Sequence, residues 1–129
     1  MKKKLLVIDD ELDLLEIMND SLTRFGHDSL CLTSPLQGLR AFYENKNEFS
    51  CIIVDYQIPD LTGVEFALQI MEMSPDMPII LTTGFADKKI QSLLSIYPNI
   101  HLLEKPFRLD ELIFLVTQIA TKGQVRVSA

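Results

Sequence analysis

The sequence has no tryptophan and contains only two cysteines and two histidines among its 129 residues. Two cysteines cannot build a disulfide framework or a four-ligand zinc site. We therefore expect Cys31 and Cys51 to be reduced thiols in the core. Basic residues are also scarce, since 12 Lys+Arg face 18 Asp+Glu and leave a net charge of −6. This charge argues against a domain that grips a phosphate backbone, so we expect no direct binding of nucleic acid.

Long apolar runs and linkers are missing as well. The apolar stretch over residues 5–8 ends at Asp9, whereas the apolar region of a signal peptide needs at least about seven residues. No run approaches the roughly 18 apolar residues that cross a bilayer. Apolar residues make up 47% of the chain, and no repeat or Pro/Gly/Ser-rich segment divides it. The sequence predicts one soluble, cytoplasmic domain with no membrane association.

Short apolar runs alternate with longer helical patterns along the chain. Continuous apolar runs are typical of strands buried on both faces of a parallel sheet. They cover residues 5–8, 51–54 and 79–81, with weaker candidates at 29–32 and 100–103. Helical patterns cover residues 11–25, 35–43, 62–73, 87–96 and 110–121. This repeated β-α order predicts a doubly wound α/β fold, with a parallel sheet and helices on both of its faces.

Polar side chains gather where the predicted strands end. The residues concerned are Asp9, Asp10, Asp55, Thr82, Thr83 and Lys105. The carboxyl ends of parallel strands meet at one edge of the sheet, where open α/β folds bind their ligands. Residues that are far apart in the sequence are therefore expected to converge there.

Three of these residues are carboxylates. Two carboxylates about 5 Å apart repel each other by roughly 3 kcal/mol at an effective dielectric constant near 20. Either one carboxyl group is protonated or a cation lies among them. Oxygen ligands favour a hard divalent ion, and a shallow site suits Mg²⁺. Such a site, with a hydroxyl and an ammonium nearby, suits phosphoryl transfer with Asp55 as the nucleophile.

Four segments resemble the receiver domains of two-component response regulators, such as single-domain chemotaxis regulators. The segments are Asp9-Asp10-Glu11, residues 55–63, residues 78–84 and Lys105-Pro106-Phe107. They occur in the family's order and at its spacing, and the resemblance runs from Lys3 to about Thr121. It implies a flavodoxin-like (βα)5 fold with a sheet of order 2-1-3-4-5. It also implies a receiver domain over residues 1–122, with residues 123–129 as a C-terminal tail or the start of a linker.

The resemblance assigns a role to each residue of the pocket. Asp55 would accept a phosphoryl group from a histidine kinase or histidine phosphotransferase. Mg²⁺ would be held by Asp9, Asp10, Asp55 and the backbone carbonyl of Gln57. The protein would then be a signalling phosphoacceptor rather than an enzyme, and phosphorylation would switch its partner binding and could drive formation of a homodimer.

Two further residues are assigned to the phosphoryl group itself. Thr83, rather than Thr82, would be the switch hydroxyl because it directly precedes the small residue Gly84. Lys105 would contact the phosphoryl group, and its bond to Pro106 would be cis, as in the family. The sequence departs from the family at Leu102, where receivers usually carry an aromatic residue that turns inward on activation, and this puts that aromatic switch in doubt.

Other interpretations remain open at this stage. Asp9 and Asp10 could simply cap the first helix, since Asp is a favoured cap residue. The chain could be a small phosphatase similar to the haloacid dehalogenases, although these carry a second Asp where this sequence has Gln57. It could also be a pseudo-receiver that binds partners without phosphorylation. Three apolar residues fall off the buried helical stripes and are candidates for partner contact: Leu12, Ile17 and Phe114.

Overall fold

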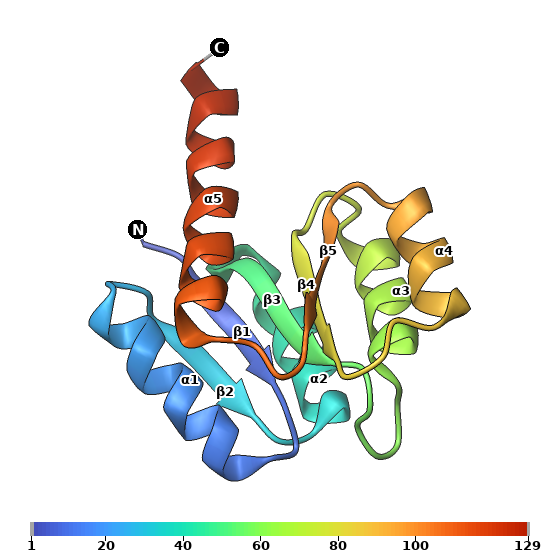
Figure 1. The fold of residues 1–129 in the computed structure, drawn as a ribbon. Helices are drawn as coiled ribbons and strands as arrows, with labels where there is room; N and C mark the ends of the chain where they lie inside the picture. Colours follow the sequence, from blue (N-terminus) through green and yellow to red (C-terminus); the bar gives the residue numbers. More distant parts are fainter. Residues whose placement is uncertain (1, 129) are drawn as a thin grey trace.

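The computed structural model describes the backbone of residues 2–128 and the side chains of residues 2–120. The strands are β1 (Lys4–Ile8), β2 (Ser29–Leu32), β3 (Phe49–Asp55), β4 (Ile79–Thr83) and β5 (Ile100–Glu104). The helices are α1 (Leu12–Arg24), α2 (Pro35–Asn45), the short 3-10 helix η1 (Lys46–Glu48), α3 (Gly63–Met73), α4 (Lys88–Ile96) and α5 (Leu109–Ser128). All five strands pair in parallel in the order β2-β1-β3-β4-β5, which confirms the predicted topology (Figure 1).

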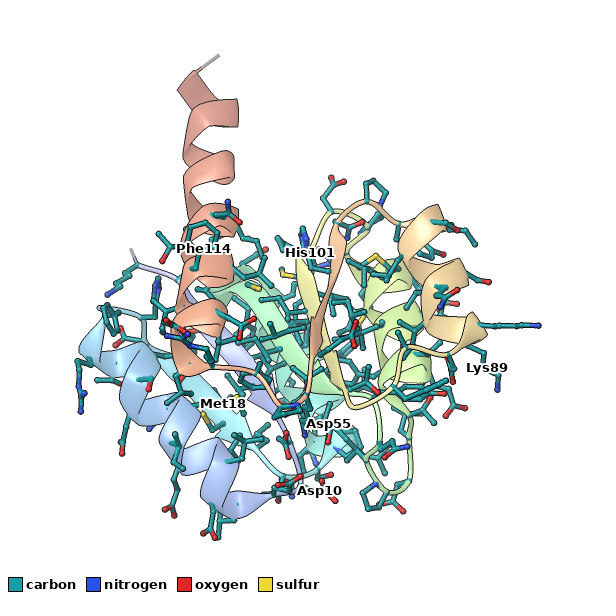
Figure 2. All side chains as sticks on the ribbon, viewed as in Figure 1. Asp10, Met18, Asp55, Lys89, His101 and Phe114 are labelled. Atoms are coloured by element: carbon teal, nitrogen blue, oxygen red, sulfur yellow. The ribbon has the colours of Figure 1, made fainter. Side chains whose placement is uncertain are left out.

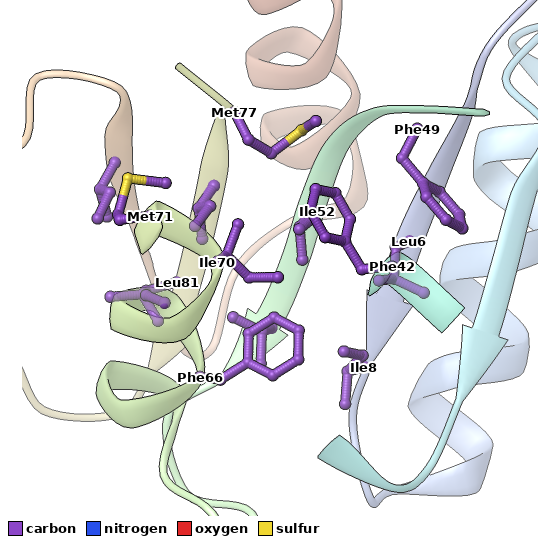
Figure 3. Packing of buried hydrophobic residues seen from close by; sticks show 14 of the residues in the cluster. Leu6, Ile8, Phe42, Phe49, Ile52, Phe66, Ile70, Met71, Met77 and Leu81 are labelled. Atoms are coloured by element: carbon purple, nitrogen blue, oxygen red, sulfur yellow. The ribbon is translucent and has the colours of Figure 1, made fainter. Parts of the chain in front are cut away.

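The sheet separates two hydrophobic cores, because neighbouring residues of a strand point to opposite faces. On one face, Leu6 and Ile8 of β1 join a cluster with Phe42 of α2 and Phe66 of α3 (Figure 3). On the other face, Val7 packs with residues of α1 and α5. The middle of each of the three central strands β1, β3 and β4 is therefore apolar on both faces, as the continuous runs in the sequence predicted.

Capping groups define where several helices begin. Thr62 accepts from the Glu65 amide, and the Glu65 carboxylate accepts from the Thr62 amide, which forms a capping box at the start of α3. Asp87 caps α4 in a similar way, because its Oδ1 accepts from the Ile90 amide at 2.9 Å. Both starts follow directly on loops at the carboxyl edge of the sheet, so the caps fix the geometry of that edge.

The last helix differs from its predicted length. It was expected over residues 110–121, but α5 begins at Leu109 and continues to Ser128. The backbone of residues 122–128 is therefore helical where a tail was expected, and the far end of α5 extends beyond the sheet (Figure 1). The domain boundary after residue 122 stays a prediction.

Other expectations of burial are confirmed. Cys51 is buried and Cys31 half-buried, and both thiols are free. Leu12, Ile17 and Phe114 are exposed, and their contact with a partner stays a prediction. Among the described residues, none of the helices combines the length and the apolarity needed to cross a bilayer.

Candidate functional site

The carboxyl edge of the sheet gathers the polar residues that the sequence singled out. β3 ends at Asp55, which lies beside Thr82 of β4, and Thr83 lies beside Glu104 of β5. Figure 2 shows Asp10 and Asp55 at this edge, far from His101 and Phe114. Asp9 and Asp55 are almost fully buried, at 1% and 6% exposure, whereas Asp10 is exposed. Two carboxylates are thus held away from water at the carboxyl ends of the neighbouring strands β1 and β3.

Lys105 joins these two buried carboxylates. Its Nζ lies 3.2 Å from Asp9 Oδ2 and 3.2 Å from Asp55 Oδ2, and it donates to both. The bond between Lys105 and Pro106 is cis, as the resemblance implied. The remaining oxygen of each carboxylate accepts from the backbone, since the Glu11 amide donates to Asp9 Oδ1 at 2.8 Å and the Gln57 amide donates to Asp55 Oδ1 at 3.3 Å. Asp9 is not the N-cap of α1, because Glu11 holds that position.

A third carboxylate completes a possible cation site. One oxygen each from Asp9, Asp10 and Asp55 lies within 4.8 Å of the others. An octahedral Mg²⁺ with bonds of about 2.1 Å holds its ligand oxygens about 3 to 4.2 Å apart. Small side-chain movements would bring the three oxygens into that range. The donor set is all oxygen, which is the type that Mg²⁺ prefers, so these residues fit the ion.

Burial and neighbouring charges shift the pKa values of the central pair. Burial raises the pKa of Asp55 above its ordinary value, the Lys105 ammonium opposes this shift, and the Asp9 carboxylate adds to it. Burial of Lys105 acts to lower its pKa, but Asp55 and Asp9 together raise it. The ammonium stays charged, and the ionised form of Asp55 is held at some cost. An added cation would relieve that cost.

The two threonines at the end of β4 are both buried. The Thr83 hydroxyl donates to the Phe85 carbonyl at 3.1 Å and accepts from the Phe85 amide at 3.2 Å. Thr83 thus lies at the expected edge, but its hydroxyl is engaged by the β4–α4 loop. Contact between this hydroxyl and a group on Asp55 requires the loop to release it.

The loop after Asp55 passes very close to the start of α3. A Cβ atom on Gly63 would lie 2.8 Å from the Asp55 carbonyl oxygen and 2.8 Å from the Tyr56 Cα atom. The Gly63 amide donates to the Tyr56 carbonyl at 2.9 Å. Glycine is therefore required at this position by close approach of the backbone.

Two features of the site were not predicted. The Glu11 carboxylate lies 3.7 Å from Lys105 Nζ, and its place directly after Asp9 and Asp10 could have indicated it. The Tyr56 hydroxyl donates to Asp87 Oδ2 at 2.8 Å. These two residues are 31 positions apart and form no known motif, so the sequence carried no signal for this contact.

Comparison with known proteins assigns this site to a family. The response regulator receiver domain family matches residues 5–117 of the chain. The chain belongs to this family. Receiver domains are signalling phosphoacceptors that bind Mg²⁺ at an acidic pocket and interact with histidine kinases or phosphotransferases. Neither a haloacid-dehalogenase-like phosphatase nor a pseudo-receiver is favoured by this result.

Individual relatives agree with the assignment. The receiver protein CpdR of Brucella abortus is 28% identical over 112 residues, which cover 86% of this chain and 91% of CpdR. The two-component response regulator ARR10 of Arabidopsis thaliana is 25% identical over 123 residues, covering 95% of this chain but only 22% of ARR10. The chain therefore spans about a fifth of the length of that relative.

Solved structures have the same fold. A response regulator receiver domain protein from Clostridium thermocellum superposes with a TM-score of 0.85 at 29% identity, covering 95% of this chain and 98% of that one. The chemotaxis protein CheY4 of Vibrio cholerae superposes with a TM-score of 0.79 at 21% identity, covering 92% of this chain and 99% of CheY4, a likeness of fold alone. In this receiver domain, Leu102 of β5 is half-buried and packs against the hydrophobic cluster that contains residues of α2, α3 and α4. This is the position where the family usually has an aromatic residue.

Proposed function

We propose that this receiver domain accepts a phosphoryl group on Asp55 and that the modification switches its binding to a partner. Mg²⁺ would be held by Asp9, Asp10, Asp55 and the backbone carbonyl of Gln57. One observation carries the proposal: a single ammonium bridges two buried carboxylates while a third carboxylate lies within 4.8 Å of both. Such a concentration of negative charge suits a cation better than it suits a structural role, and the cation and the ammonium together would offset the charge of an incoming phosphoryl group.

The proposed reaction is a transfer from a phosphohistidine. A carboxylate oxygen of Asp55 attacks the phosphorus atom, and a P–O bond forms as the P–N bond to the imidazole breaks. The leaving nitrogen keeps the bonding electron pair, and the donor leaves as a neutral histidine because its second ring nitrogen carries a proton during the transfer. Mg²⁺ would supply positive charge beside the phosphoryl oxygens. Lys105 Nζ, now 3.2 Å from Asp55, would donate to one of these oxygens.

Thr83 would respond to the modification. Its hydroxyl is bonded to the backbone of Phe85 in the present arrangement. A phosphoryl oxygen on Asp55 is a stronger acceptor than a neutral carbonyl, because bonds to ionised groups are roughly twice as strong. We expect the hydroxyl to leave Phe85 for the phosphoryl group and to displace the β4–α4 loop. That displacement would change the surface that a partner, or a second copy of the domain, recognises.

Small phosphodonors test the proposal without a known kinase. Purified protein is incubated with acetyl phosphate or phosphoramidate, with and without Mg²⁺, and labelling is followed by intact-mass measurement. We expect labelling only with Mg²⁺ and none in Asp55→Asn. The matched control is Asp76→Asn, an exposed carboxylate before β4 at the opposite edge of the sheet, which should label like the wild type. Equal labelling of Asp55→Asn and wild type would show that Asp55 is not the acceptor.

A further inference from the structure

Tyr56 ties the phosphoacceptor to three other elements. It directly follows Asp55, and its amide donates to the Thr82 carbonyl of β4 at 2.8 Å. Its carbonyl accepts from the Gly63 amide at the start of α3. Its hydroxyl donates to Asp87 Oδ2 at 2.8 Å. The backbone of Tyr56 is thus fixed on one side, and its side chain reaches the beginning of α4 on the other.

The two carboxylate oxygens of Asp87 accept hydrogen bonds from different partners. Oδ1 caps α4 through the Ile90 amide, and Oδ2 receives the Tyr56 hydroxyl. The pKa shifts of both groups agree with this geometry: hydrogen bonds from the Ile90 amide and then from Tyr56 lower the pKa of Asp87. The hydrogen bond to Asp87 raises the pKa of Tyr56. The position of the α4 cap is therefore coupled to the residue beside the phosphoacceptor.

The β4–α4 loop between Thr83 and Lys88 has few other attachments. Gly84 is exposed and has open space around it, and the Phe85 side chain is 65% exposed. Its hydrogen bonds join Phe85 to Thr83 and the Ala86 carbonyl to the Gln91 side chain. Asp87 accepts from the amides of Ile90 and Gln91 at the start of α4 and from the Tyr56 hydroxyl. In Figure 2, Lys89 projects away from the molecule just beyond this loop. Of these bonds, only the one from Tyr56 connects the loop to the chain segment that directly follows Asp55.

We propose that Tyr56 is a positioning residue whose bond to Asp87 holds the β4–α4 loop in the arrangement seen here and thereby opposes the Thr83 rearrangement. Thr83 must release Phe85 to reach a phosphoryl group, and Asp87 lies only two residues beyond Phe85. A loop this short transmits the displacement to Asp87 and strains its bond to Tyr56. The inference rests on the proposed phosphorylation of Asp55, and it names a residue that sets how readily that step occurs.

Loss of the Tyr56 hydroxyl should favour the phosphorylated arrangement. We expect Tyr56→Phe to bind beryllofluoride, a mimic of the phosphoryl group, about two- to tenfold more tightly in saturating Mg²⁺, which is the range for one partly exposed hydrogen bond. Labelling of Tyr56→Phe by phosphoramidate should also be faster than labelling of the wild type. The dissociation constant for Mg²⁺ alone should be unchanged, because the hydroxyl does not contact the carboxylates of the cation site. A merely structural effect of the substitution would alter both constants.

A second substitution separates the hydrogen bond from the side chain. Asp87→Ser keeps a favourable cap for α4, but it removes Oδ2, the oxygen that accepts from Tyr56. We expect Asp87→Ser to raise beryllofluoride affinity as Tyr56→Phe does, and the double variant to show no further increase. The matched control is Tyr43→Phe, an exposed tyrosine on α2 that should leave the affinity unchanged.

The outcomes distinguish this inference from the function on which it rests. If the wild type is not labelled and does not bind beryllofluoride, the proposed phosphorylation of Asp55 and the role of Tyr56 are both wrong. If the wild type is labelled but Tyr56→Phe binds beryllofluoride within twofold of it, or more weakly, only the role of Tyr56 is overturned. Additive effects of the two substitutions would likewise overturn it, because they would show that the residues act independently.

Discussion

At the scale of single residues, Lys105 is the counter-ion of the two buried carboxylates. Its side chain is 20% exposed, yet its ammonium is shared by Asp9 and Asp55, which are almost completely buried. A buried carboxylate that loses its partner keeps the full cost of its desolvation. The same contact that would later hold a phosphoryl oxygen therefore also stabilises the unmodified fold.

Replacement of Lys105 should reveal this cost. We expect Lys105→Met to lower the free energy of unfolding by about 1–3 kcal/mol without Mg²⁺, since two buried acceptors lose an ionic partner. Addition of Mg²⁺ should restore part of the loss by supplying another cation. Urea unfolding at neutral pH measures both effects. Lys88→Met, at an exposed lysine of α4, is the control and should change stability by less than about 0.5 kcal/mol; an equally small effect of Lys105→Met would contradict the argument.

At the scale of elements, the phosphoacceptor loop is shaped by its contact with α3. Gly63 begins α3 at a point where the backbone of Asp55 and Tyr56 leaves no room for a Cβ atom. The capping box of Thr62 and Glu65 fixes the same turn from the other side. The position of Asp55 is therefore set by backbone packing as well as by its strand.

Two glycines near the site should respond differently to the same substitution. We expect Gly63→Ala to reduce the free energy of unfolding by about 1–3 kcal/mol, because backbone atoms 2.8 Å away must shift. Gly84→Ala meets nothing within 4 Å and should be neutral or stabilising by up to about 1 kcal/mol. Denaturant midpoints of the two variants measure the difference. Similar midpoints would show that the close approach at Gly63 does not constrain the loop.

The sequence predicted the elements well where a physical pattern spans several residues. The continuous apolar runs identified β1, β3 and β4, because burial on both faces excludes polar residues from them. The end of α5 was predicted too early, since Gly123 is a poor helix former and no apolar stripe marks the segment beyond Thr121. Local sequence patterns identify an element where its apolar residues recur at a regular spacing, and they are weak where that spacing is lost.

The candidate site was predictable to the extent that topology determines it. Asp9, Asp10, Asp55 and Lys105 converge because parallel strands end at one edge. The orientation of the Thr83 hydroxyl and the bond between Tyr56 and Asp87 depend on side-chain rotamers and on loops that meet only in the folded chain. No spacing in the sequence encodes such contacts.

At the scale of the whole molecule, the cation site should couple metal binding to folding. A ligand that binds only the native state at 100 times its dissociation constant adds about 2.7 kcal/mol of stability. We expect saturating Mg²⁺ to stabilise the wild type by this order, and Asp10→Asn by clearly less, because an exposed carboxylate of the site is lost. Urea unfolding in Mg²⁺, with NaCl of equal ionic strength as the control, measures the effect. Equal stabilisation by the two salts would contradict a specific site.

The sheet also divides the interior of the molecule into two independent compartments. Side chains that pack with α1 and α5 come from one face of the strands, and those that pack with α2, α3 and α4 come from the other. Because the hydrogen-bonded backbone of the sheet lies between them, a repacking around α4 need not disturb the contacts beneath α1. Such a molecule can stay engaged by one protein on its first side while it presents an altered face to another protein on its second.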